Sequence, residues 1–234
     1  MPKPFLSVII PVGPTEAEVP QGLLHDLQHL PDGAELIFVV CKQAQLALAQ
    51  SCTSLSNYSV KWFCTKPGRA IQMNRGAKEA GGQYLWFLHL DSRFESGLVS
   101  SLLDNLKRYP ERLHYCLLTF IADGPSRMPI NALGANLRSR ILAVPFGDQG
   151  FLISKSLFEQ VGGYPEAVAY GEDHLFVWYA RQQGIKLKCC SVPLSTSARK
   201  YEDKGWFKIT CLYQRLWLKQ AWPEFIKLVK QRYF

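Results

Sequence analysis

Four short polar clusters in this chain carry side chains that could bind a phosphate or a metal ion, or move a proton. Each cluster follows an apolar run or precedes a helical pattern, so each is expected at a strand end or a helix start. Ligands bind beyond the carboxyl ends of parallel strands, and loops at that edge of a sheet would bring several clusters together. The clusters are Gly68–Arg69 with Asn74, His89–Asp91, Gly147–Gln149 and Glu172–Asp173.

His89, Asp91 and Ser92 form the polar tip of an apolar run that begins at Trp86. Such a run, without polar alternation, is typical of a strand that is buried on both faces. A carboxylate at the tip suits Mg²⁺ or Mn²⁺, which proteins often hold through one or two carboxylates together with substrate phosphates. The alternative is that Asp91 begins a turn or caps the helix predicted over residues 96–109.

Arg69 and the pair Glu172–Asp173 each stand at the predicted start of a helix. An arginine there offers a planar fork beside free backbone donors, which suits a phosphate or an acceptor-rich base. Adjacent carboxylates beside a bound metal have shifted pKa values and could supply a general base. Both features also have a structural interpretation, as a solvated arginine and as partners of the helix dipole.

The composition narrows the class of protein. The 234 residues are 47% hydrophobic and 20% charged, which is ordinary for one α/β domain. Seven scattered cysteines without a Cys-x-x-Cys pair argue against a disulfide framework and a zinc site. The net charge of +8 fits an anionic partner. Charge without a recognition motif is weak support for nucleic-acid binding, so we expect no nucleic-acid partner.

Apolar strand patterns and helical patterns alternate four times within the first ninety or so residues. This alternation predicts a doubly wound, mostly parallel sheet. Thr15 is expected to cap a helix over residues 16–30, with Glu18 at the capping-box position. Near the end, we predict two strands and then two helices that separate at Trp222-Pro223. The expected strands cover residues 5–12, 35–41, 60–64, the run from Trp86, 114–122, 151–153, 186–192 and 194–198.

The polar clusters, taken in order, resemble those of a family 2 glycosyltransferase with the GT-A fold of nucleotide-diphospho-sugar transferases. The likeness is greatest to a bacterial subgroup with Gly-Arg-Ala-x-Gln-Met-Asn and His-x-Asp motifs. It covers residues 5–201, and each motif is weak alone, whereas their order and spacing together are distinctive. The matching segments are Ser7–Pro11, Gly68–Ala77, Leu88–Ser92, Gly147–Gly150, Gly162–Pro165, Glu172–Asp173 and Ser197–Arg199.

The resemblance implies an inverting transfer of a sugar from a nucleoside diphosphate to an acceptor hydroxyl, assisted by Mn²⁺ or Mg²⁺. Asp91 matches the last carboxylate of the family's Asp-x-Asp motif and would bridge the metal ion to the diphosphate. Asp173, next to Glu172, matches the catalytic carboxylate that takes the acceptor's proton. The remaining residues expected around the donor are Pro11, Val12, Gly13, Arg69, Asn74, His89, Asp148 and Gln149.

Three positions depart from the family pattern. Cys41 follows the second strand where the family usually has an Asp that binds the base, and residues 12–15 replace the usual Thr-x-Asn-Glu. His89 stands where the classical motif has its first carboxylate, although the subgroup shares this histidine. The alternative function is therefore a non-catalytic GT-A-like binding or scaffold protein with a degenerate nucleotide pocket.

The chain divides into a GT-A domain over residues 1–200 and a basic, aromatic helical tail over residues 201–234. From Arg199 to Phe234 there are nine Lys or Arg and three Asp or Glu residues. Aromatic residues flanked by cations suit a helix on an anionic membrane, where a lipid-linked acceptor could be presented, or a stripe that covers the domain core. No membrane span or secretory h-region is seen. We expect a cytoplasmic protein, either free or peripheral on the inner face of the membrane.

Overall fold

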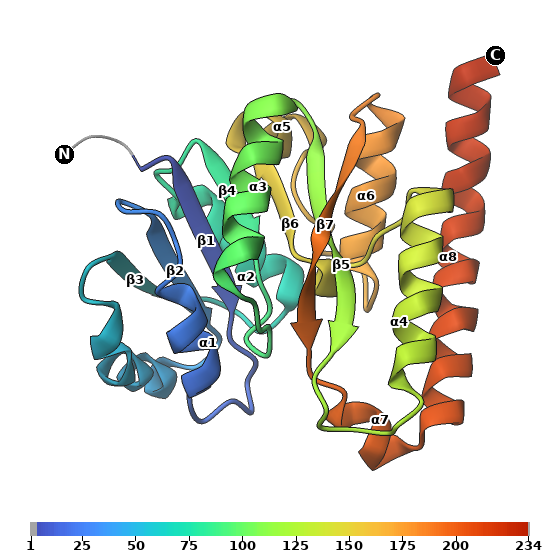
Figure 1. The fold of residues 1–234 in the computed structure, drawn as a ribbon. Helices are drawn as coiled ribbons and strands as arrows, with labels where there is room; N and C mark the ends of the chain where they lie inside the picture. Colours follow the sequence, from blue (N-terminus) through green and yellow to red (C-terminus); the bar gives the residue numbers. More distant parts are fainter. Residues whose placement is uncertain (1–3, 234) are drawn as a thin grey trace.

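A seven-stranded sheet forms the centre of the computed structural model, which describes residues 4–233 (Figure 1). Residues 1–3 and 234, including the last residue of the predicted tail, lie outside the described part. The strand order is β3-β2-β1-β4-β6-β5-β7. The strands are β1 Leu6–Pro11, β2 Glu35–Val40, β3 Ser59–Cys64, β4 Tyr84–Phe87, β5 Leu113–Phe120, β6 Phe151–Ser154 and β7 Leu187–Thr196.

The sheet is mostly parallel, as predicted. Neighbouring strands pair in parallel except at β6, which runs antiparallel to both β4 and β5. The carboxyl ends of β1, β4, β5 and β7 therefore lie at one edge, together with the start of β6. The predicted polar clusters precede or follow these strands, so the topology brings them to this edge.

Helices cover both faces of the sheet, which confirms the doubly wound architecture. One face carries α1 (Gln21–Leu27), the 3₁₀ segment η1 (Gln43–Leu55) and α3 (Ser96–Arg108). The other carries α2 (Arg69–Glu79), α5 (Lys155–Val161) and α6 (Glu172–Gln182). Along β1, Val8 and Ile10 belong to the first core and Ile9 to the second. This double burial explains why the strand sequences are continuously apolar.

The remaining helices lie beside the β7 edge (Figure 1). They are α4 (Met128–Leu137), the π-helical segment η2 (Arg138–Leu142), the 3₁₀ turn η3 (Gly147–Gln149), α7 (Arg199–Lys204) and α8 (Trp206–Tyr233). Ala221 and Leu228 of α8 are buried against Trp178 of α6 and Val144. Within residues 4–233, every helix is too short or too polar to cross a membrane.

Three predicted boundaries were wrong, each because of a proline. The first helix starts at Gln21 rather than at residue 16, with Pro20 at its N-cap, because a proline disfavours helical geometry at the residue before it. The two strands predicted over 186–198 are the single strand β7, whose register shifts beside Pro193. The two helices of the tail separate at Gly205 and not at Trp222-Pro223, because α8 continues through Pro223, with Ala221 and Leu228 buried on either side of the proline.

Candidate active site at the carboxyl edge of the sheet

A cavity of about 400 Å³ lies beyond the end of β1. We refer to it as the Asp91 cavity. Its walls come from the loop after β1, the start of α2, the tip after β4 and the start of α7. Such convergence is expected at the carboxyl edge of a parallel sheet. The polar and charged side chains in the wall are Glu16, Arg69, Gln72, His89, Asp91 and Arg199.

Two side-chain amides hold the loop after β1 in shape. Gln72 donates from Nε2 to the carbonyl of Val12 at 2.8 Å, and Gln45 donates to the carbonyl of Gly13 at 2.8 Å. Pro11 and Gly13 consequently line the Asp91 cavity, whereas the Val12 side chain is fully buried in the core. Of the three loop residues predicted near the donor sugar nucleotide, Pro11 and Gly13 therefore line the cavity and Val12 does not.

Cys41 does not line the Asp91 cavity. Its thiol is buried and lies 3.7 Å from the carbonyl of Val12, to which it donates weakly. Burial raises the pKa of this thiol, so it stays protonated. Cys41 occupies the position where the family usually has a base-binding Asp. Here its side chain supports the loop after β1.

A second cavity, of about 460 Å³, lies on the other side of Arg69. We refer to it as the Asp173 cavity, because Glu172 and Asp173 line it together with Tyr170 and Glu166. The Arg69 guanidinium lines both cavities and forms an ion pair with Glu172, with 3.9 Å between Nε and Oε1. Burial, and next the charge of Asp173, raise the pKa of Glu172.

The Asp173 carboxylate, at the start of α6, accepts hydrogen bonds from two backbone N–H groups, one on η3 and one on α6. The N–H of Gly147 donates to Oδ2 at 2.6 Å, and the N–H of His174 donates to Oδ1 at 2.8 Å. A side chain at position 147 would meet Asp173 Oδ2 at 3.1 Å and His89 Nε2 at 3.2 Å. Only glycine lets the backbone approach so closely, and this approach brings the β4 tip next to the α6 start.

Asp148 lies behind this carboxylate with its Oδ1 buried and without a hydrogen-bond partner among the described residues. Burial raises its pKa, against the opposing effect of Lys200 and Arg138. Arg138 likewise has a buried polar atom, Nη2, without a hydrogen-bond partner among the described residues. Its guanidinium stacks 3.5 Å above the Phe146 ring. Two opposite, unsatisfied groups so close to Asp173 are costly, and such groups are frequent at functional sites.

Asp91 fits a divalent cation better than any other carboxylate at the edge. It lines its cavity and has no hydrogen bond or ion pair with another described residue. His89 is its neighbour in the wall, and burial, followed by the charges of Arg69 and Lys200, lowers the pKa of His89 so that the ring is neutral. Within residues 4–233, no three His, Cys, Asp or Glu side chains form a metal cluster. Asp91 would therefore hold a cation together with phosphate oxygens.

Two predicted site residues are structural instead. Gln149 is 0% exposed, accepts hydrogen bonds from Ser139 and Phe146, and donates to the carbonyl of Cys116. The Asn74 side chain joins α2 to the chain around Tyr164, from which Oδ1 accepts and to which Nδ2 donates, both at 2.9 Å. Neither residue is among those that line the two cavities, and Asn74 also donates to Glu166 of the Asp173 cavity at 2.8 Å, so both amides support the site through contacts within the protein.

Arg199 lines the Asp91 cavity, although the sequence indicates it only as the end of the matching segment Ser197–Arg199. Asp123 accepts hydrogen bonds from Ser197 Oγ at 2.6 Å and from the N–H of Ala198 at 2.7 Å. These bonds turn the chain after β7 so that Arg199 enters the wall of the Asp91 cavity. Arg199, whose Nε also lies 3.8 Å from Asp123 Oδ2, thus adds a second cation to this wall, and two cations suit a ligand with more than one negative charge.

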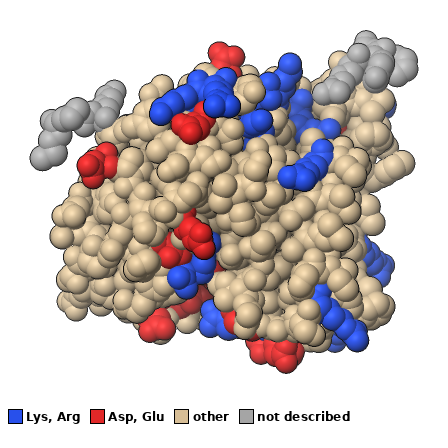
Figure 2. Space-filling model, in the orientation of Figure 1, with Lys and Arg blue, Asp and Glu red and all other residues tan. Residues whose placement is uncertain are grey.

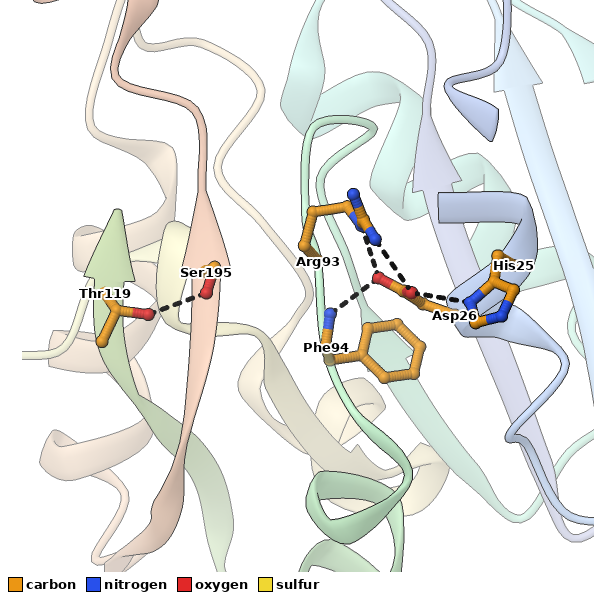
Figure 3. Close-up of polar contacts among 6 residues, drawn as sticks. All are labelled: His25, Asp26, Arg93, Phe94, Thr119 and Ser195. Carbon is orange, nitrogen blue, oxygen red and sulfur yellow. Dashed lines mark hydrogen bonds and ion pairs between the residues drawn. The ribbon is translucent and has the colours of Figure 1, made fainter. Parts of the chain in front are cut away.

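Asp26 of α1 holds the chain that follows Asp91 (Figure 3). Its carboxylate accepts from Arg93 Nε at 2.7 Å and from the N–H of Phe94 at 2.9 Å. On the opposite side, Arg93 exchanges two backbone hydrogen bonds with Ser195, whose hydroxyl contacts Thr119 at 2.8 Å. The segment after the β4 tip is therefore clamped between α1 and β7.

Comparison with known proteins supports the fold. TarS 1-349 from S. aureus, solved in complex with UDP-GlcNAc, has a TM-score of 0.66 at 17% identity over 83% of this chain. The mannosyltransferase PcManGT from Pyrobaculum calidifontis, in complex with GDP-Man and Mn²⁺, has 0.62 at 16% over 82%. This chain spans only 59% and 56% of those two chains. No family description and no curated protein matches the sequence. The chain has the GT-A-like, mixed α/β fold found in these glycosyltransferase structures.

Proposed function

We propose that this protein is a metal-dependent, inverting glycosyltransferase of the family 2 type, which moves a sugar from a nucleoside diphosphate to an acceptor hydroxyl. The observation that carries the proposal is the arrangement of Asp91, Arg69 and Asp173. These residues come from three distant segments and line two cavities that share Arg69 as a common wall. The nucleotide sugars in the two solved relatives agree with this assignment.

The Asp91 cavity has the chemistry of a diphosphate site. Arg69 lies at the start of α2, where the guanidinium and the free N–H groups of the first turn both favour an anion. Arg199 supplies a second positive charge in the same cavity. A bound Mn²⁺ or Mg²⁺ would be held by Asp91 and would stabilise the negative charge that the departing nucleoside diphosphate gathers.

Asp173 would act as the general base. Its two hydrogen bonds from Gly147 and His174 fix the carboxylate at the wall of the second cavity. An acceptor hydroxyl bound there would give its proton to Asp173 as its oxygen attacks the anomeric carbon, and the bond to the diphosphate would break on the opposite side. Glu172 holds Arg69 in place through their ion pair.

The direct test is calorimetric titration of UDP and GDP into the purified protein, with and without Mn²⁺. We expect one of the two nucleotides to bind at micromolar to millimolar concentration, and only when the metal ion is present. The nucleotide that binds identifies the base of the donor. Absence of binding by either one at several millimolar, from a folded protein, would favour the alternative of a non-catalytic GT-A-like binding or scaffold protein, which Cys41 also suggests.

The clamp on the β4 tip gives a further prediction. Asp26→Asn removes the charge that binds Arg93 and Phe94, and hydrogen bonds to charged groups contribute about 1.5–3 kcal/mol each. We expect the free energy of unfolding to fall by about 2 kcal/mol. We also expect the affinity for nucleotide with Mn²⁺ to fall several-fold when it is measured well below the melting temperature of the variant. Asp104→Asn, which breaks only the exposed contact with Lys107, is the control and should change neither quantity. Unchanged affinity in Asp26→Asn would make the clamp purely structural.

A further inference from the structure

An apolar stripe on α4 and the following π-helical segment points away from the core. Its members are spaced three and four residues apart, so they share one side of the helix. The core side carries Met128, Ala135 and Ser139, which are all buried. The stripe consists of Ile130, Leu133, Leu137 and Ile141, with exposed fractions of 48–74%.

A matching stripe lies on α8, next to α4. The two helices are joined at one end by Asn131, which accepts from Trp206 Nε1 at 2.7 Å and donates to Thr210 at 3.0 Å. Towards its other end, α8 packs on α6 through Ala221 and Leu228. The exposed apolar side chains of α8 include Phe207, Leu218, Trp222 and Phe225, which are spaced so as to share one side of the helix and have exposed fractions of 46–70%.

Between α4 and α8 lies a groove of about 570 Å³ with mainly apolar walls. We call the stripes and the groove together the α4/α8 face. Figure 2 shows that the surface over these helices is largely without charged residues and that Lys and Arg side chains lie at its margins. An exposed apolar surface of this extent marks an interaction site. The groove is lined by Ile130, Leu137, Ile141, Leu142, Trp206 and Trp217, among others.

The charge of the same segments is almost entirely positive. Residues 124–147 contain three arginines and no acidic residue. Residues 206–231 contain five Lys or Arg and a single acid, Glu224, whose carboxylate is buried and bonded to Lys227 and Gln182. The exposed apolar side chains thus share these segments with an excess of cations, of which Lys227 is paired with Glu224.

We propose that the α4/α8 face docks on an anionic lipid bilayer, with the two apolar stripes in the boundary between headgroups and acyl chains. Apolar side chains flanked by Lys and Arg are the combination that binds such a surface. A second copy of the chain is a poor occupant, because pairing the face with itself would bring the mainly positive segments of both copies together.

Docking in this way would direct the Asp173 cavity towards lipid-attached acceptors, a consequence that rests on the proposed function. Arg138 lines the groove and stacks on Phe146, and the next residue, Gly147, donates to Asp173. The wall of the groove and the catalytic carboxylate are therefore parts of one packed unit. A hydroxyl or phosphate on a lipid at the face would need to move only past this loop to reach the acceptor side.

The test is flotation of the full chain, without nucleotide, on vesicles of phosphatidylcholine with one quarter phosphatidylglycerol. We expect the protein to float with these vesicles, to float much less with pure phosphatidylcholine, and to be released by 0.5 M NaCl. Leu133→Glu/Ile141→Glu should bind at least about 25-fold more weakly, because each new negative charge opposes a contribution of about fivefold. Both positions are exposed and distant from the cavities, so circular dichroism and melting should be unchanged.

The matched control is Gln83→Glu/Ser100→Glu, which lowers the net charge equally at two exposed positions on other elements. It should bind at least fivefold more tightly than Leu133→Glu/Ile141→Glu. Equal losses in the two variants would overturn the proposal, since general charge rather than this face would then explain binding. It would also be overturned if wild-type protein failed to float at millimolar lipid, or if it formed dimers that Leu133→Glu/Ile141→Glu made monomeric. None of these outcomes depends on nucleotide binding, so the proposed function is tested separately.

Discussion

The Asp173→Asn variant is expected to lose about 10²–10⁴-fold in kcat, the usual contribution of a positioned general base, with little change in nucleotide affinity. Asparagine has nearly the same shape and can still accept the hydrogen bond from Gly147, but it cannot take a proton. The diphosphate site is formed by other residues, around Asp91. The measurement is release of nucleoside diphosphate from the donor in the presence of Mn²⁺, with water as acceptor.

The matched control for this prediction is the neighbouring variant Glu172→Gln. Glu172 has its ion pair with Arg69 and a raised pKa caused mainly by burial, so its replacement should lower kcat by less than about tenfold. A larger loss in Glu172→Gln than in Asp173→Asn would transfer the role of base to Glu172. If Asp173→Asn and Glu172→Gln were both as active as wild type, neither carboxylate would take part in the chemistry.

The second large effect is expected from Asp91→Ala. Loss of a partner that merely orients a metal ligand costs 10–100-fold in metal affinity, so loss of the ligand itself should weaken Mn²⁺-dependent nucleotide binding by more than about 100-fold. The reason is that the described residues offer no three-membered His, Cys, Asp and Glu cluster to replace it. Calorimetric titration of the bound nucleotide with Mn²⁺ measures the change.

Metal removal provides the control for Asp91→Ala. Wild-type protein in a chelator should bind nucleotide as weakly as the variant does with Mn²⁺, and addition of a chelator to the variant should change nothing further. If the variant still gained affinity from Mn²⁺, the cation would have other ligands, and the nearest candidates are His89 and the buried carboxylate of Asp148. Melting curves of the variant should match those of wild type, because Asp91 bonds to no other described residue.

The sheet, and the edge of it at which the candidate site residues meet, could be predicted from local patterns in the sequence. A strand that is buried on both faces must be apolar at every position, so β1, β2 and β4 were recognisable from composition alone. Helix starts with Gly68–Arg69 and Glu172–Asp173 were also correctly placed. Because parallel strands share one carboxyl edge, the meeting of these clusters could be predicted from their order along the chain.

The roles of individual polar side chains were decided only by the tertiary structure. Gln149 and Asp148 are adjacent in sequence, yet Gln149 is satisfied by Ser139, Phe146 and Cys116 inside the core, while Asp148 retains an orphan oxygen near Asp173. Whether a polar group is free for a ligand depends on partners far away in the chain, and no local pattern encodes them.

The tail is a second case in which the sequence predicts the character of a segment and the structure shows which of its side chains are buried. Helical spacing and basic charge were visible in the sequence, but they could not tell a stripe that covers the core from one that faces outwards. In the structure, Ala221 and Leu228 are buried against α6, whereas Phe207 and Trp222 are exposed. The sequence by itself determined the fold class, the sheet edge that carries the site and the basic amphipathic character of α8. Tertiary packing alone decided which side chains face the cavities and that α4 and α8 form one apolar face, because both outcomes depend on contacts between segments distant in the chain.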